Sequence, residues 1–183
     1  IGLVDIKIDF LHNFDPVSHL PAERPLLVDF ARRNGFTIVH FHRRRLLDQL
    51  LSLEIGHRIG QWHYTTRDQG DPAPPPPFEL DVSDTLLRLR VMHSSSGLLV
   101  EWLRGYRGYV SVLYEDAFQD STRIAPQVIE QLSRTLSIEL PDEIALPFRP
   151  SPFTPADLVA NYRQLEDAAT DAGLLTPNLL TEA

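Results

Sequence analysis

Short β-branched runs alternate along this chain with longer stretches whose apolar residues recur every three or four positions. Residues 36–42, FTIVHFH, form one such run, and from Arg44 to His63 the leucines and isoleucines follow the spacing of a helix with one buried face. Strands separated by helices of this length are typical of a mainly parallel sheet covered by helices on both faces. The pattern therefore predicts an α/β fold.

The same alternation continues over the rest of the chain. Further strands are expected at residues 2–10 and 109–118, and further helices at 25–34, 84–104, 124–138 and 155–171. Asn34 and Gly35 provide a left-handed end for the first of these helices. Thr154, Pro155 and Asp157 supply the cap, the first-turn proline and the first-turn acid of the last one. An SSSG run disfavours a continuous helix over the second.

The composition narrows the class of protein. With 183 residues, 43% of them apolar, the chain is expected to form one domain over residues 1–183, with a proline-rich loop at 64–81. Its formal charge of −8 argues against a general nucleic-acid binder, which would carry a basic face. It has no cysteine for disulfides, thiolate zinc sites or nucleophiles. No apolar stretch is long enough to span a membrane, so a soluble protein is expected.

Three consecutive arginines, Arg43, Arg44 and Arg45, follow the strand predicted at residues 36–42, and we call them the arginine junction. If the strand ends near His42, they lie in the first turn of the next helix, where unpaired N–H groups and the helix dipole favour an anion. Guanidinium groups bind phosphate through forked, charge-assisted hydrogen bonds. The sequence thus predicts a phosphate site, with arginines that are solvated or paired with nearby acids as the alternative.

The segment TIVHFHRRRLLDQLLSLEIGHRIGQWH resembles the part of sulfotransferases that binds the 3′-phosphate of 3′-phosphoadenosine 5′-phosphosulfate (PAPS). That family carries an arginine just after a strand and a serine eight residues later, and Arg44 and Ser52 match this spacing. SVLYEDAFQDSTRIAPQVIEQLSRTLSI and FRPSPFTPADLVANYRQL resemble later family segments in the same order. The proline-rich GQWHYTTRDQGDPAPPPPFELD is similar to bacterial carbohydrate sulfotransferases of the nodulation-factor type. The resemblance covers most of residues 36–168.

This resemblance implies a P-loop-NTPase-like three-layer sandwich that uses PAPS without a metal to sulfate a hydroxyl of a carbohydrate or glycolipid. The cofactor-binding residues that it implies are Arg44 and Ser52, supported by Arg43 and Arg45, with Tyr114 near the adenine and Arg149 and Ser151 closing over the 3′-phosphate. Tyr114 as a core residue and 149–151 as a plain surface loop are the alternatives. Trp62 and His63 lie toward the acceptor, unless Trp62 packs in the core. The cytoplasm is the default compartment, and the oligomeric state is not indicated.

Sulfuryl transfer needs a base for the acceptor hydroxyl and cations for the charge that develops on the sulfonate and the leaving phosphate. By resemblance, Lys7 would steady the sulfonate, and Asp9 or His12 would take the proton. The alternative is that Lys7 and Asp9 are outward positions of an alternating strand. His40 and His42 share a strand face but have no acidic third ligand nearby in sequence, so no metal site is expected.

The family also has an N-terminal strand, a Ser/Thr- and Gly-containing loop that cradles the 5′-phosphosulfate, and a helix. No such loop occurs in these 183 residues. An N-terminal segment that precedes the printed sequence is one expectation. A catalytically silent binding module that has lost the loop is another, and a P-loop small-molecule kinase, which would require magnesium, is a third.

Overall fold

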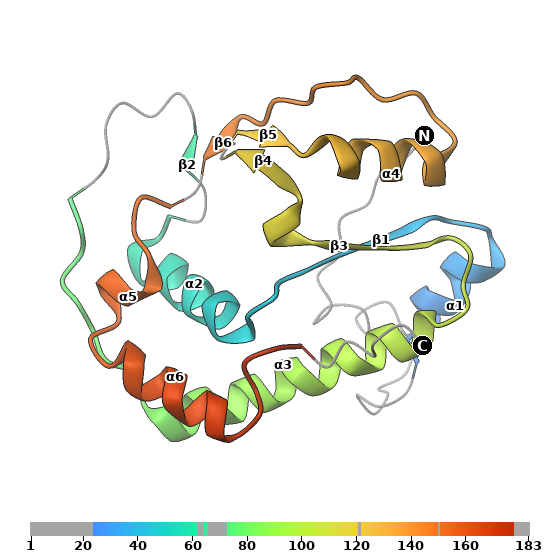
Figure 1. Cartoon of the computed structure of the whole chain (residues 1–183). Helices are drawn as coiled ribbons and strands as arrows, with labels where there is room; N and C mark the ends of the chain where they lie inside the picture. Colours follow the sequence, from blue (N-terminus) through green and yellow to red (C-terminus); the bar gives the residue numbers. More distant parts are fainter. Residues whose placement is uncertain (1–23, 62–63, 66–72, 121, 150, 178–183) are drawn as a thin grey trace.

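The computed structural model describes residues 24–61, 64–65, 73–120, 122–149 and 151–177, so the strand expected at 2–10 lies outside the described residues. In chain order the elements are α1 (Leu26–Arg33), β1 (Ile38–His42), α2 (Leu46–Ile59), β2 (Tyr64–Thr65), α3 (Val82–Leu103), β3 (Tyr109–Leu113), η2 (Tyr114–Asp116), β4 (Phe118–Asp120), β5 (Arg123–Ile124), α4 (Pro126–Leu136), β6 (Phe148–Arg149), α5 (Pro155–Leu158) and α6 (Tyr162–Asp171). Figure 1 shows helices arranged around a small parallel sheet, which confirms an α/β fold.

The parallel sheet pairs β1 with β3. Its register runs from Ile38 opposite Tyr109 to His42 opposite Leu113, so both strands end at the same level. The chain between them passes through α2 and α3, as the crossover between parallel strands requires. Over the described residues the other two strand pairs, β2 with β6 and β4 with β5, are antiparallel. The parallel part of the described structure is therefore narrower than the sequence pattern predicted.

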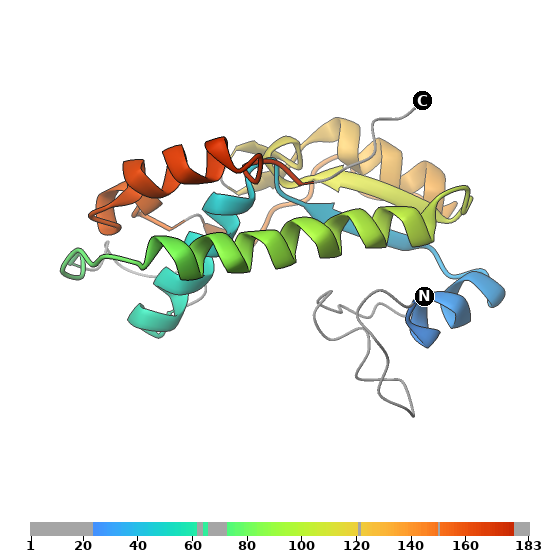
Figure 2. The ribbon, with the colours of Figure 1, turned by 90° about the horizontal axis from the view of Figure 1, so that it is seen from below.

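Helices border both faces of this strand pair. Val110 and Val112 of β3 are buried against Val128 of α4 on one face. On the other face, Tyr109 packs against Leu99 and Leu103 in the C-terminal half of α3. Alternate strand residues point to opposite faces, so the period-two pattern of β3 matches the two helices. Figure 2 shows α3 running along the length of the molecule, with α1 near its C-terminal end.

The largest buried cluster lies among helices away from the sheet. Leucines on one face of α2, at the three-and-four spacing that predicted this helix, pack with Leu89 of α3 and Leu165 of α6. The residues of α2 in this cluster are Leu46, Leu47, Leu50 and Leu51. The helix ends at Ile59 instead of continuing to His63, because Gly60 takes a left-handed conformation with φ of 71°. Tyr64, expected in the loop, instead pairs with β6.

The predicted C-terminal helix is two helices in the structure. The prediction of one helix over 155–171 was wrong, because the segment after Leu158 bonds to the extended chain at Phe78. The N–H of Phe78 donates to the carbonyl of Leu158 at 2.9 Å, and that of Ala160 to the carbonyl of Phe78 at 2.8 Å. Asn161 then accepts from the N–H of Leu80 and donates to its carbonyl. These contacts satisfy backbone groups that a continuous helix would have used.

Of two further predictions about helices, the break at the SSSG run was wrong and the left-handed residue after α1 was confirmed. The SSSG run does not interrupt α3, so that expectation was wrong, since Leu89 on one side of the run and Leu99 and Leu103 on the other are buried. Tertiary packing of this kind outweighs weak local preferences. At the end of α1, Gly35 has φ of 69°, which confirms the predicted left-handed residue.

Candidate functional site

The arginine junction lies at the carboxyl end of the parallel strand pair. Arg43 and Arg44 connect β1 to α2, and Arg45 is the N-cap of α2 with φ of −119°. The prediction that all three arginines lie in the first turn of the helix was therefore wrong. The helix starts at Leu46, two residues after the expected start at Arg44, and the N–H of Leu46 donates to the carbonyl of Leu175 at 2.8 Å.

Two acidic residues from the neighbouring strand end meet Arg44. β3 stops at Leu113, and the following residues form the short helix η2, so Glu115 and Asp116 leave the strand earlier than predicted. The backbone N–H of Arg44 donates to Glu115 Oε2 at 3.0 Å, and its guanidinium donates to Asp116 Oδ1 at 3.2 Å. The Arg44 side chain remains 60% exposed. Among the described residues, its guanidinium has no other partner, so several N–H donors face solvent.

Arg43 points to an aromatic side chain instead. Its guanidinium carbon lies 4.0 Å from the ring centroid of Tyr114, a cation–π contact. That ring also forms an edge-to-face contact with Phe118, with centroids 5.0 Å apart. Tyr114 is half-buried beside the arginine junction, and one face of its ring is covered by the Arg43 guanidinium.

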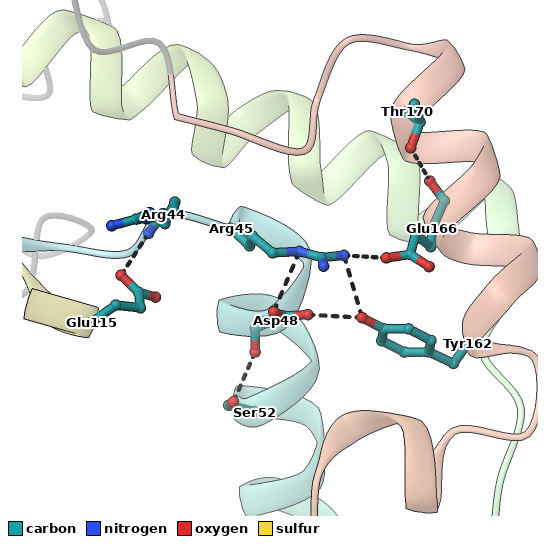
Figure 3. Close-up of polar contacts among 8 residues, drawn as sticks. All are labelled: Arg44, Arg45, Asp48, Ser52, Glu115, Tyr162, Glu166 and Thr170. Carbon is teal, nitrogen blue, oxygen red and sulfur yellow. Dashed lines mark hydrogen bonds and ion pairs between the residues drawn. The ribbon is translucent and has the colours of Figure 1, made fainter. Parts of the chain in front are cut away.

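Arg45 turns away from Arg44 and toward the C-terminal helix, as Figure 3 shows. It forms an ion pair with Glu166, donates to the hydroxyl of Tyr162 at 3.3 Å, and lies 3.4 Å from a carboxylate oxygen of Asp48. The hydroxyl of Tyr162 in turn donates to Asp48 at 3.2 Å. The hydrogen bond to Glu166 raises the pKa of Arg45, and burial, followed by the nearby Asp48, raises the pKa of Tyr162. Arg45 is thus held by two helices.

The remaining predicted site residues are less closely connected to the arginine junction. Ser52 lies on α2 and donates to the carbonyl of Asp48 at 2.7 Å, while Ser151 accepts from the N–H of Phe153 at 3.1 Å. The backbone of Arg149 belongs to β6, opposite Tyr64. Five predicted residues lie outside the described residues: Lys7, Asp9, His12, Trp62 and His63.

Sequence reasoning missed three residues of this network. Asp48 follows Arg45 by three positions on one helix, a spacing that predicts a contact. Tyr162 and Glu166 lie 117 and 121 positions from Arg45, and no local pattern connects them to it.

Two histidines extend the site along β1. His40 Nδ1 lies 3.0 Å from the hydroxyl of Tyr109, and His42 Nε2 lies 2.8 Å from Ser111 Oγ. Burial, followed by the nearby His42, lowers the pKa of His40 to about 4. Burial also lowers the pKa of His42, with Glu115 opposing that shift. Both rings are therefore neutral at pH 7 and add no positive charge to the arginine junction.

Neither a metal site nor a membrane span is found in the described part of the chain. Over these residues, no group of three or more His, Asp or Glu side chains is placed to hold a metal ion. None of the helices that the structure describes combines the length and the apolar composition needed to cross a bilayer.

Comparison with known proteins gives no assignment. No protein-family model, curated protein or solved structure matches the chain. The interpretation therefore depends on the chemistry of the site. An exposed guanidinium and an aromatic ring at the carboxyl ends of parallel strands can hold an anion that is attached to a planar group.

Proposed function

We propose that this chain is a PAPS-dependent sulfotransferase domain that moves a sulfuryl group to a hydroxyl of a carbohydrate or glycolipid. The observation that carries the proposal is the position of Arg44, exposed two residues after the end of β1 and followed on α2 by Ser52. Nucleotides bind at the carboxyl ends of parallel strands, where Arg44 lies. The helices on both faces of the β1–β3 pair support a three-layer P-loop-like sandwich.

The side chains at the arginine junction fit the charged part of such a nucleotide. The N–H groups of Arg44 that Asp116 leaves free are donors for phosphate oxygens. Tyr114 offers a ring on which a base can stack once Arg43 moves aside. When bound, the nucleotide supplies the activated sulfuryl group. In this proposal Lys7 binds the sulfonate, Asp9 or His12 accepts the proton of the acceptor hydroxyl, and no metal takes part.

Calorimetric titration with adenosine 3′,5′-bisphosphate and adenosine 5′-phosphate tests the nucleotide site. We expect the wild type to prefer the bisphosphate, and Arg44→Ala to weaken its binding by about 2 kcal/mol, roughly thirtyfold, because a charged hydrogen bond is lost. Arg134→Ala is the matched control, because Arg134 is an exposed arginine in an ion pair with Glu130 on α4. Unchanged affinity in Arg44→Ala would remove Arg44 from the site. No binding by the folded wild type would refute the proposal.

The pairing of Arg44 with Asp116 predicts that a substitution of Asp116 strengthens nucleotide binding, whereas a substitution of Arg44 weakens it. In the structure the carboxylate of Asp116 occupies part of the guanidinium that the phosphate would use and repels an incoming anion. Because exposed ion pairs are worth only ~0.2–1 kcal/mol, we expect Asp116→Asn to tighten bisphosphate binding about two- to fivefold. The same titration measures this change. Weaker binding in Asp116→Asn would mean that Asp116 supports the anion site instead of competing with it.

A binding module without catalysis is a second candidate. Its basis is that the described contacts at the arginine junction, of Arg44 with Asp116 and of Arg43 with Tyr114, bear on anion binding and not on sulfuryl transfer. Incubation with PAPS and a panel of oligosaccharides separates the two candidates, since only an enzyme releases adenosine 3′,5′-bisphosphate in step with acceptor sulfation.

A further inference from the structure

We propose that Glu166 and Tyr162 of α6 are positioning residues for the anion site, and that they act through Arg45 without touching the ligand. This inference rests on the proposed nucleotide site at Arg44. Arg45 then has a different role from the phosphate binding that its place beside Arg43 and Arg44 in the sequence implies. Of the three arginines, Arg45 orients the connection between β1 and α2, and Arg44 is left to bind the phosphate.

The backbone of Arg45 sets the direction of the chain at the arginine junction. Arg45 is the residue at which the chain changes from the extended connection to the helix, with φ of −119° and ψ of 114°. The direction in which Arg44 leaves the helix start depends on these two angles, because the two residues are neighbours. A contact that restrains Arg45 therefore also restrains Arg44, in addition to the hydrogen bond from the Arg44 N–H to Glu115. The connection has no side-chain cap of its own that would do this, since the N-cap is an arginine.

Side chains from two helices restrain Arg45. Its guanidinium contacts Glu166, Tyr162 and Asp48, three oxygen-bearing partners on two helices. Arg45 and Glu166 are only 37% and 32% exposed, so this ion pair is more shielded from solvent than the pair between Arg44 and Asp116. Partial shielding and several partners make such a contact a stronger restraint than an isolated surface ion pair.

The helix α6, which carries Glu166 and Tyr162, packs against the start of α2. Leu165 and Ala169 of α6 are buried in the same cluster as Leu46 at the start of α2. The N–H of Leu46 also donates to the carbonyl of Leu175, in the segment that follows α6. The C-terminal segment thus holds the start of α2 by apolar packing and by a backbone hydrogen bond, while Glu166 and Tyr162 hold the arginine beside it (Figure 3).

The direction of the charge effect makes the inference testable. Neutralising a carboxylate near an anion site strengthens anion binding if the carboxylate acts only through its charge. A positioning residue gives the opposite sign, because Arg45 loses its restraint and Arg44, then held only through Glu115 and Asp116, is less firmly placed. Partners that orient metal ligands change affinity ~10–100-fold when they are removed, and by analogy we expect Glu166→Gln to weaken adenosine 3′,5′-bisphosphate binding about tenfold.

A second variant removes the contact without changing charge. Tyr162→Phe loses the hydroxyl that joins Arg45 to Asp48 but keeps the ring, so we expect about threefold weaker binding for one lost hydrogen bond. Glu54→Gln is the matched control. It breaks an ion pair between α2 and α3, in which Arg88 lies 2.6 Å from Glu54, and over the described residues the further partner of that pair is Asp84 and not a residue of the arginine junction. We expect it to lower the melting temperature without changing nucleotide affinity.

The experiment is a calorimetric titration of the four proteins with adenosine 3′,5′-bisphosphate, at a temperature at which circular dichroism shows each of them folded. Weaker binding in Glu166→Gln and Tyr162→Phe, with Glu54→Gln equal to wild type, supports the inference. Unchanged or tighter binding in either α6 variant overturns it while the proposed function stands, provided that the wild type binds. If Glu166→Gln does not fold, Tyr162→Phe alone decides. No binding by the wild type overturns both the proposed function and this inference.

Discussion

Replacing Leu47 with alanine is expected to lower the free energy of unfolding by about 3 kcal/mol, within the ~2–5 kcal/mol typical of buried leucines. Leu47 is 0% exposed and belongs to the cluster in which α2 packs against α3, α6 and Val159. The substitution removes buried methyl groups and leaves a cavity between helices that are anchored elsewhere, so the site cannot fully collapse. Urea denaturation followed by circular dichroism measures the loss as a lower midpoint at unchanged slope.

Leu53→Ala is the matched control, because the same substitution then falls on the same helix. Leu53 is 40% exposed, so less apolar surface is lost and no cavity forms. Alanine also favours the helix slightly. We expect a change within about 0.5 kcal/mol. Equal losses in Leu47→Ala and Leu53→Ala would contradict the buried face assigned to α2.

The face of α2 is the part of the fold that the sequence predicted best. A helix with one buried face repeats its apolar residues every three or four positions, so Leu46, Leu47, Leu50 and Leu51 could be identified without any partner. The break after Leu158 was not predictable in this way. It depends on Phe78 and Leu80, and nothing local to residues 155–171 indicates that another segment will bond there. Local periodicity identifies elements, whereas tertiary pairing decides where they end.

In the candidate site, too, local sequence patterns identified some residues, whereas tertiary packing determines the others. Arg44 was identified from its neighbours, because a cation directly after a strand is a local feature. The contact of Arg44 with Glu115 follows from the strand register. His42 lies opposite Leu113 at the strand ends, and Arg44 and Glu115 each lie two positions further along the chain. A parallel pairing of the two strands, if assumed, would have predicted that contact. The pairing of Arg45 with Glu166 requires the packing of α6 on α2, which no motif in the sequence encodes.

The role of charge in the site depends on geometry more than on composition. Three adjacent arginines give one ring contact, one exposed ion pair and one shielded network. Arg44 is the most exposed of the three and keeps unused donors, whereas the charge of Arg45 is paired with Asp48 and Glu166, so the positive charge open to an anion is smaller than three residues would supply. The neighbouring histidines add none at neutral pH, because burial keeps His40 and His42 uncharged.

Lowering the pH from 6.5 to 4 is expected to remove about 3 kcal/mol of stability through His40 alone. The pKa of His40 falls from 6.5 to about 4 on folding, so between these values the unfolded chain binds a proton that the folded protein excludes. Stability therefore rises with pH in this window, by about 1.4 kcal/mol per unit, and is fully present above pH 6.5. The hydroxyl of Tyr109 and the ring of His42 lie beside His40, and the lowered pKa of His42 adds a change of the same sign.

Carboxylates also titrate in this range, so the test compares the wild type with His40→Gln, whose amide can bond to the hydroxyl of Tyr109 but carries no charge at any pH. Urea denaturation at half-unit steps from pH 4 to pH 7.5 gives the free energy of unfolding of each protein. The free energy of the wild type minus that of the variant should be constant above pH 6.5 and should fall by about 3 kcal/mol between pH 6.5 and pH 4, because only the wild type then loses stability through His40. Parallel curves over the whole range would mean that the His40 side chain is hydrated and can take up a proton without unfolding.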